Sequence, residues 1–502
     1  MTEKTAELFN KYKEYKDLIE KYEYCLFIIS FDCVTDCPKN DREYSNDIQE
    51  FLTQKVLDIS LSNDYIKLIY DLYEVRSELD EVYKLDIEIE HKEQEKIRKI
   101  PRDELDKHIA NSYRSSHEWE VARTNLDYSK FLVELKELVE FNKKYCVWEE
   151  TNDIKGYDVL LDDMEDGYNQ KLYDEFFEKI EKDLLPFVKE ILNKESKYNK
   201  KLDELKFDIS KQKELTKRIS EIMEYDDKVG CIRETIHPFT NYANTNDVRI
   251  TTRYREDLLF SNLYSVMHEI GHALFQLHMD PKYNGTNVFD NVTCITHESQ
   301  SRFYENYLGR SRAFVKYLYP ILIELFPNEL EGITEEDIYY YVNSPKAQFN
   351  RCEADELTYP FHVLIRYNVE KKLFNGEINV SQMEETFNYY MNLYFGITPP
   401  NKLIGVFQDS HWSSGFGYFP TYALGSAYGA MFLEAMKKDI DVDKDLSVGN
   451  FKNINIWLTE HIHKYSGTRK NLEVVRSVCG KEFDPDIYIN YLKKKFSDIY
   501  LK

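Results

Sequence analysis

Residues 268–272 read His268-Glu269-Ile270-Gly271-His272. On a helix, the two histidines lie one turn apart on the same face, so that both imidazoles can bind one metal ion. The glutamate beside the first histidine can then act as general base on a water molecule that the metal activates. The pentapeptide therefore predicts a helix that carries two metal ligands, His268 and His272, and a catalytic carboxylate, Glu269.

The flanks of this segment are apolar, as expected for a helix inside a large protein: Leu263, Val266, Met267, Ala273, Leu274 and Phe275. The alternative interpretation is an amphipathic helix with two core histidines and a surface glutamate. A third ligand would favour the metal site, because a hydrolytic zinc site usually has three protein ligands and one open position.

The candidates for the third ligand are one histidine and two glutamates. His278 follows His268 by ten residues, which on an unbroken helix is about 15 Å along the axis. Phe275 stands where a chain-reversing glycine would be needed, so we reject His278. Glu298, which follows His272 by 26 residues, and Glu305, about two turns further on, both remain candidates. The alternative places both carboxylates on a solvated helix face.

The composition predicts a soluble globular protein. Of the 502 residues, 42% are hydrophobic and 31% are charged, and the formal net charge is −24. This charge disfavours binding to nucleic acids and to anionic membranes. We find no apolar signal core near Met1 and no stretch of about 18 apolar residues. The eight cysteines include no CxxC pair, so we expect a reduced, cytoplasmic protein.

The chain has only 17 glycines and 13 prolines, which favours long helices. Two apolar stripes indicate helix packing. The first has 4-3-4-3 spacing and continues into charged residues up to Arg98, where Pro101 ends the segment or begins the next helix. The second extends from about Asp103 to Lys144. Their apolar residues are Leu68, Leu72, Val75, Leu79 and Val82 in the first stripe, and Trp119, Ala122, Leu126, Phe131, Leu132, Leu135 and Leu138 in the second.

Strand signals are sparse. Residues 247–253 alternate β-branched side chains just before the predicted metal helix, and we expect an edge strand there that lines a cleft. No Pro/Ser-rich hinge, low-complexity linker or internal repeat divides the chain. We therefore predict a single, mainly helical domain over residues 1–502. Its helical part at about 1–200 would cover the cleft, and about 201–502 would form the catalytic core.

Several further motifs resemble those of the carboxypeptidase Taq family of metallocarboxypeptidases. In chain order they are similar to an Asp-x-Arg-x-Thr motif, a His-Glu-Ser-Gln element, an Ile-Arg-x-x-Ala-Asp element and a Gly-x-x-Gln-Asp-x-His-Trp element. The third has Asn350 in place of the leading Ile. The matching residues are Asp247, Arg249 and Thr251; His297, Glu298, Ser299 and Gln300; Arg351, Ala354 and Asp355; and Gly405, Gln408, Asp409, His411 and Trp412.

The resemblance spans nearly the whole chain and implies an α-helical zinc-peptidase fold of the ACE/neurolysin type. That fold has a long active-site cleft and a small β-sheet beside the metal helix. The resemblance also implies a homodimer, one zinc ion per chain with cobalt as the alternative, and the release of single residues from free peptide C-termini with broad specificity. Under this resemblance the third metal ligand is Glu298 rather than Glu305.

A carboxypeptidase must hold the free terminal carboxylate of its substrate, and a planar guanidinium suits that contact. We expect Arg351 to be this anchor. Arg249 is the second choice, with a role in organising its strand as the alternative. His411 and Tyr422 are assigned to the oxyanion or to the substrate carboxylate, without a division of roles between them.

Three other residues complete the predicted site. His237 is either a substrate contact or a structural histidine next to Pro238. Asp355 and Asp409 are predicted to orient a histidine or an arginine.

Two other functions remain open from the sequence. An endo-acting helical metallo-oligopeptidase would share the metal ligands but would tolerate a blocked C-terminus. A non-catalytic helical scaffold would have kept the fold for binding partners.

Overall fold

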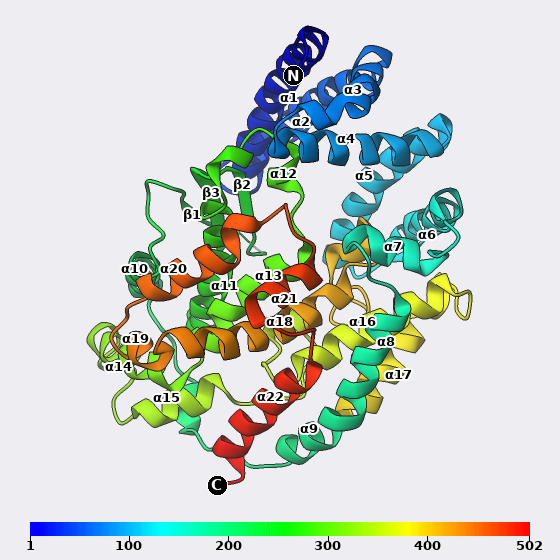
Figure 1. Ribbon diagram of the computed structural model, residues 1–502. Helices are drawn as coiled ribbons and strands as arrows, with labels where there is room; N and C mark the ends of the chain where they lie inside the picture. The colour runs from blue at the N-terminus through cyan, green and yellow to red at the C-terminus, as the bar shows by residue number, and fades with distance from the viewer. Residues whose placement is uncertain (236) are drawn as a thin grey trace.

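The computed structural model describes residues 1–235 and 237–502, and within them helices predominate around one small sheet (Figure 1). The predicted fold class, mainly helical with a small sheet beside the metal helix, is confirmed. No described helix combines the length and the apolar character that crossing a lipid bilayer requires.

The chain begins with a layer of four helices, drawn in blue at the top of Figure 1: α1 Glu3–Val34, α2 Arg42–Ser60, α3 Asn63–Val75 and α4 Glu81–Lys99. The first predicted stripe is therefore divided between α3 and α4. The break follows from Asp80, whose carboxylate accepts hydrogen bonds at 3.1 Å from the backbone amides of Val82 and Tyr83. An aspartate in this position caps a new helix instead of continuing the old one.

The second predicted stripe also belongs to two helices, α5 Arg102–Asn125 and α6 Ser129–Glu149. The chain reverses at Leu126, whose φ of 56° is left-handed and ends α5. Leu126 is 59% exposed, so its assignment to the apolar face was wrong. The other stripe residues are buried or half-buried in the interface between the two helices and the core: Trp119, Ala122, Phe131, Leu132, Leu135 and Leu138.

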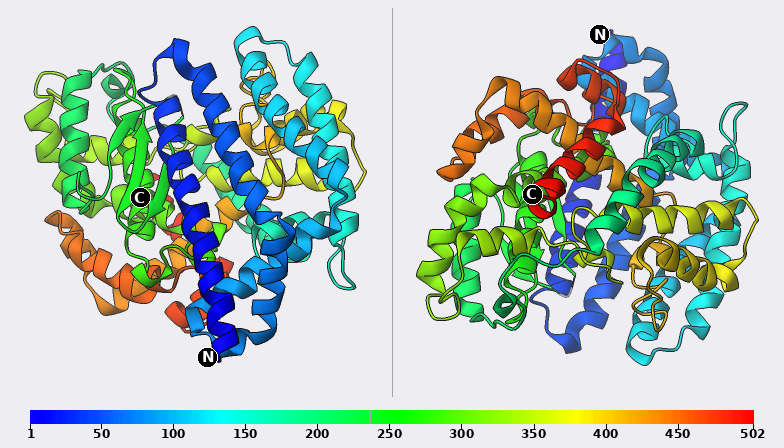
Figure 2. Two further views of the ribbon diagram at one scale, coloured as in Figure 1. Left: turned by 90° about the horizontal axis from the view of Figure 1, so that it is seen from above. Right: turned by 90° about the horizontal axis from the view of Figure 1, so that it is seen from below.

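The sheet has three strands in the order β1-β3-β2, with bounds Ile232–Glu234, Asp247–Thr252 and Thr240–Asn244 respectively. Strand β1 is parallel and β2 antiparallel to β3. The predicted strand over 247–253 exists, but it is the central strand and not an edge strand. Its Ile250 pairs with Ile232 on one side and Thr240 on the other. Seen from above, α1 runs beside this sheet (Figure 2).

Three helices form the centre of the molecule: α11 Leu259–Leu277, α13 Cys294–Arg302 and α18 Phe419–Asp439. Two glycines allow α13 to lie this close to its neighbours. A Cβ on Gly271 of α11 would lie 2.8 Å from the Cα of Ser301, and one on Gly425 of α18 would lie 3.0 Å from the side chain of Glu298. These contacts fix α13, and with it Glu298, against the helix that carries the two histidines.

The remaining helices surround this centre (Figures 1 and 2). A π-helical turn, Phe303–Gly309, continues α13. The largest hydrophobic cluster begins at Trp119 and extends to Tyr500, whereas residues from Phe9 to Ile87 form a separate cluster. The other helices are α7 Tyr157–Met164, α8 Gln170–Lys179, α9 Leu185–Leu192, α10 Ile209–Ile222, α12 Asn287–Asp290, α14 Arg312–Leu325, α15 Glu335–Val342, α16 Tyr359–Phe374, α17 Met383–Phe395, α19 Val442–Ser447, α20 Lys452–His461, α21 Asn471–Cys479 and α22 Pro485–Tyr500.

Candidate metal centre and active site

Helices α11 and α13 bring together the ligand atoms of His268, His272 and Glu298, which all lie within 4.8 Å of one another. The Oε2 atom of Glu298 is 3.7 Å from Nε2 of His268 and 3.3 Å from Nε2 of His272. A tetrahedral zinc site with bonds of about 2.0–2.1 Å separates neighbouring ligand atoms by roughly 3.3 Å. Two imidazoles and one carboxylate at this spacing fit a divalent metal such as zinc.

The rival carboxylate, Glu305, lies on the other side of His268. Its Oε2 is 2.9 Å from Nδ1 of that ring, so it holds the nitrogen that faces away from Glu298. Carboxylates in this position fix the orientation of a metal-binding imidazole. His278, rejected from the sequence, lies with its Nδ1 3.3 Å from Nδ1 of His463, beyond the C-terminal end of α11.

Two arginines hold these carboxylates, of which Arg302 is buried and Arg310 half-buried. Arg302 donates from Nε to Glu298 at 2.9 Å and from Nη1 to Glu305 at 3.1 Å, and Arg310 donates to the other oxygen of Glu305 at 3.1 Å. Burial alone would raise the pKa of Glu298, but His268, Arg302 and His272 hold that pKa below its usual range. Against the same effect of burial, Arg302, His268 and Arg310 hold the pKa of Glu305 below its usual range. Both glutamates are therefore ionised at neutral pH, the state that metal binding and ring orientation would require.

Glu269 lies on the same helix and is 7% exposed. The hydroxyl of Thr240, on β2, lies 2.6 Å from its Oε2 and 3.0 Å from its backbone oxygen. No sequence motif marks Thr240, whose position beside Glu269 depends on the pairing of β2 with β3.

A second group of polar residues surrounds Arg351, which is 6% exposed. Its Nε donates to Asp409 at 2.9 Å and its Nη1 to the hydroxyl of Tyr359 at 3.2 Å. Its guanidinium lies 4.6 Å from the ring centroid of Tyr422, whose hydroxyl is 2.9 Å from Nε2 of His411. Arg351, His411 and Tyr422, which are distant in sequence, thus form one cluster.

Tyr359 joins this cluster to the group of His268, His272 and Glu298. One face of its ring lies 3.7 Å from the guanidinium of Arg302, which binds Glu298, while its hydroxyl accepts from Arg351. Burial and Arg351 lower the pKa of His411 to about 4. Burial raises the pKa of Tyr422 well above its usual value. At neutral pH the pair is therefore a neutral imidazole beside a protonated phenol.

The remaining predicted residues lie in other surroundings. Arg249 makes two hydrogen bonds to Asp247, at 2.9 and 2.8 Å, and its guanidinium is 4.9 Å from the ring of Phe27 in α1. The side chain of His237 is exposed to solvent. Desolvation by the protein around it, and the charges of Arg123 and Arg253, lower its pKa.

The two aspartates differ. Asp409 orients Arg351, as predicted. Asp355 accepts instead from the backbone of Lys346, Leu357 and Thr358 and from the Thr358 hydroxyl. The prediction that Asp355 orients a histidine or an arginine was therefore wrong, because the turn before α16 uses its oxygens.

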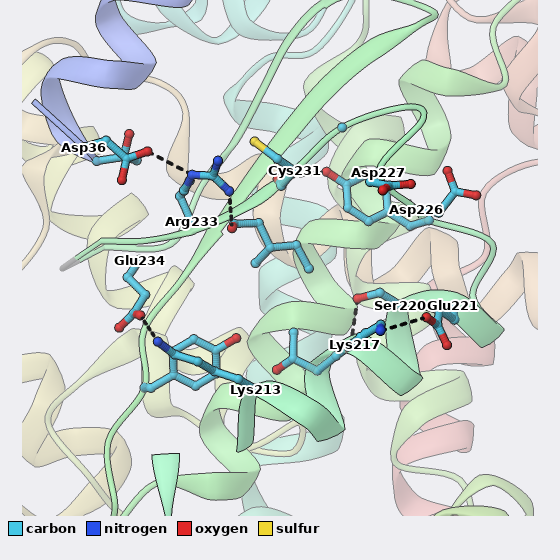
Figure 3. Close-up of a pocket in the computed structure, with 16 residues that line it drawn as sticks. Asp36, Lys213, Lys217, Ser220, Glu221, Asp226, Asp227, Cys231, Arg233 and Glu234 are labelled. Carbon is cyan, nitrogen blue, oxygen red and sulfur yellow. Dashed lines mark hydrogen bonds and ion pairs between the residues drawn. The ribbon is translucent and has the colours of Figure 1, made fainter. Parts of the chain in front are cut away.

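A cavity of about 730 Å³ lies between the end of α1, helix α10 and strand β1 (Figure 3). None of the predicted site residues lines it. Its cations are already paired with carboxylates, so it offers no charge for a ligand anion: Arg233 with Asp36 at 2.9 Å, Lys213 with Glu234 at 2.5 Å and Lys217 with Glu221 at 3.9 Å.

Comparison with known proteins gives one consistent result. Residues 11–496 match the family model described as carboxypeptidase Taq (M32) metallopeptidase. Carboxypeptidase 1 of Bacillus subtilis is 35% identical over 494 residues, which cover 97% of this chain and 98% of that relative.

Solved structures agree with this match. The M32 carboxypeptidase of Deinococcus radiodurans superposes with a TM-score of 0.92 at 25% identity, covering 99% of this chain and 100% of that one. Metallocarboxypeptidase 1 of Trypanosoma cruzi gives a TM-score of 0.90 at 26% identity, covering 98% and 99%.

Proposed function

Because the chain belongs to the carboxypeptidase Taq (M32) metallopeptidase family, we propose that it removes single residues from peptide C-termini. In this proposal His268, His272 and Glu298 hold one zinc ion, with cobalt as the alternative, and the specificity is broad. The observation that carries the proposal is the connection through Tyr359 between the His-His-Glu group and the buried Arg351. The group that would hydrolyse the peptide bond and the arginine that would bind the terminal carboxylate then lie at one site.

When bound, the metal polarises the scissile carbonyl and lowers the pKa of a water molecule. Glu269 removes the proton from the attacking water and carries it to the departing nitrogen. Thr240 holds one carboxylate oxygen of Glu269 at 2.6 Å, so that the other oxygen performs the transfer. Glu305 keeps His268 oriented, which leaves Glu298 as the third ligand.

Arg351 binds the terminal carboxylate of the peptide, with its orientation fixed by Asp409 and Tyr359. His411 and Tyr422 lie next to it and donate to the oxyanion or to the same carboxylate. The contacts of Arg249 with Asp247 and Phe27 support its role in organising the sheet beside α1. His237, which is exposed, contacts the substrate beyond the scissile bond.

Four further parts of the proposal concern the assembly, location and architecture of the protein and not the reaction. They are a homodimer, a cytoplasmic location, one peptidase domain over residues 1–502, and a cleft covered by the N-terminal helices. The homodimer follows from the family resemblance and the location from the cysteine pattern. The helices up to Ile87 have a hydrophobic cluster of their own, apart from the main cluster that begins at Trp119, which supports an N-terminal covering part.

One experiment tests the activity. We would incubate the zinc-loaded protein with one peptide as the free acid and as the C-terminal amide, and follow the products by mass spectrometry. We expect stepwise loss of single C-terminal residues from the free acid only, because the amide has no anion for Arg351.

Chelator should abolish the reaction, and zinc or cobalt should restore it. Internal cleavage of both peptides would identify an endo-acting oligopeptidase and contradict the role of Arg351. No cleavage with either metal would favour a non-catalytic scaffold.

A further inference from the structure

Arg366, on α16, is completely buried and has no place in the mechanism described so far. Its Nε donates to Oδ2 of Asp409 at 2.6 Å, and its Nη1 donates to the backbone oxygen of His362 at 2.7 Å. Its Nη2 has no hydrogen-bond partner among residues 1–235 and 237–502. Burying a charged side chain is costly unless the charge is paired and hydrogen-bonded, and among the residues that the structure describes, the only carboxylate that Arg366 contacts is Asp409.

The same Asp409 also accepts from Arg351, through Oδ1 at 2.9 Å. Two guanidiniums therefore share one carboxylate, which leaves one positive charge. The nearest titratable side chains do not neutralise it. Burial lowers the pKa of His362 well below its usual value and that of His411 to about 4, so both rings are neutral at pH 7.

The tyrosines of the cluster do not neutralise this charge either. Burial raises the pKa of Tyr359, which accepts from Arg351, and that of Tyr422, so both remain protonated. Glu298 is already paired with Arg302 at 2.9 Å. The Arg351–Asp409–Arg366 triad thus retains one positive charge in a buried site.

Resting on the proposed function, we propose that Arg366 is a positioning residue that neutralises Asp409, so that the charge of Arg351 remains available for the terminal carboxylate of the peptide. Arg366 is too deeply buried to contact the substrate, and it acts through Asp409. Without it, Asp409 and Arg351 would form a neutral ion pair. That pair would still be oriented, but it would have no net charge to offer an anion.

The net charge of the triad can be set by substitution. It is +1 in the wild type, 0 in Arg366→Met, and +1 again in the double variant Arg366→Met/Asp409→Asn. Arg366→Lys retains +1 and keeps a cation within reach of Asp409. The amide oxygen introduced by Asp409→Asn can still accept from Nε of Arg351, so the double variant keeps the orientation of Arg351. A purely structural role for Arg366 makes the double variant worse than the single one, because the ion pair between Arg351 and Asp409 is lost as well.

The test measures kcat and KM of the zinc-loaded variants with a blocked tripeptide as free acid. It also measures binding of the same tripeptide, as acid and as amide, to metal-depleted protein by calorimetry, where no turnover occurs. We expect Arg366→Met to raise KM and weaken binding of the acid by roughly ten-fold or more, with little change in kcat or in the binding of the amide. The double variant should recover most of that loss, and Arg366→Lys should stay close to the wild type.

A double variant that binds the acid more weakly than Arg366→Met would overturn the inference, as would equal losses for acid and amide. Circular dichroism and zinc stoichiometry identify a variant that has failed to fold. In that case the Arg366→Lys protein is the remaining test: because its charge is unchanged, its KM must be unchanged, and a raised KM would overturn the inference. If the wild type does not prefer the acid over the amide, the proposed function fails and not this inference alone.

Discussion

The carboxylates of Glu298 and Glu305, seven positions apart, contact different nitrogens of the same imidazole, that of His268. Glu298 lies against Nε2 of His268 and Glu305 against Nδ1. Since a ring nitrogen that binds a metal leaves the other one to donate a hydrogen bond, the position of each carboxylate defines its role. The sequence could not separate the two glutamates, because both occur on one helical stretch and only the path of α13 between α11 and α18 distinguishes them.

At the residue scale, Glu269→Gln should lower kcat by about 10²–10⁴-fold. The amide cannot accept a proton, yet it preserves the contact with Thr240. Because Glu269 is not among the three grouped ligands, zinc stoichiometry measured by elemental analysis should remain that of the wild type.

Glu305→Gln is the matched control, and it should behave in the opposite way. It leaves the base intact but weakens the hold on His268, so that zinc affinity should fall by about 10–100-fold. At saturating zinc it should lose less kcat than Glu269→Gln does. Loss of bound zinc in Glu269→Gln would show that this residue has been assigned the wrong role.

At the scale of elements, the loop before α18 depends on one glycine. Gly417 has a φ of 87°, and a Cβ there would lie 2.5 Å from the backbone oxygen of Leu160 in α7. Its amide also donates to the buried carboxylate of Glu370 at 2.8 Å. Gly417→Ala should therefore lower the free energy of unfolding by about 1–3 kcal/mol, and reduce activity because His411 belongs to the same loop.

Gly415→Ala, two positions earlier, provides the control. A Cβ there meets nothing within 4 Å, and a substitution of this kind usually changes stability by less than about 0.5 kcal/mol. Urea unfolding of both variants measures the difference. Equal stability of the two proteins would mean that the loop tolerates a side chain at Gly417.

Helix and strand content could be predicted from the sequence better than element boundaries and pairing. The apolar stripes located the helices. The breaks at Asp80 and Leu126 depend on the backbone conformation of single residues, which does not change the spacing of the apolar side chains. The alternation over 247–253 located β3. Its central position depends on β1 and β2, which are three and five residues long and show no comparable pattern.

At the scale of the whole molecule, buried carboxylates without a cation make stability depend on pH. Glu165 is 2% exposed, and burial raises its pKa to about 8 despite a hydrogen bond from the amide of Ile295. In the unfolded chain the pKa is about 4.3. The folded state therefore binds the proton more tightly, and the stability that this adds is lost as the pH rises from about 4.3 through 8.

Glu165→Gln removes this dependence, because the amide does not titrate and can still accept from Ile295. The free energy of unfolding of the wild type relative to the variant should be higher at pH 5 than at pH 9, because at pH 5 only about 1 kcal/mol of the effect is lost. At pH 9 the variant should be the more stable by a few kcal/mol, on the order of what the pKa difference implies. Urea unfolding in the presence of chelator at both pH values measures this, and a variant that becomes relatively less stable at pH 9 would contradict the argument.

The separation of the hydrophobic clusters has a consequence for cooperativity. The cluster from Phe9 to Ile87 and the main cluster share no buried apolar side chain. They are connected through a small third cluster around α12, formed by Met279, Tyr283, Val288 and Phe289. Beside it, Asp86 accepts a hydrogen bond from the amide of Asn287 at 2.8 Å. Elements that bury different surfaces can open with different free energies. We therefore expect the first helices to open with a lower free energy than the helices α11, α13 and α18, which amide hydrogen exchange of the two regions would measure. Under the proposed function, a change in the stability of the first helices would alter how easily a peptide enters, without a change in the packing around His268, His272 and Glu298.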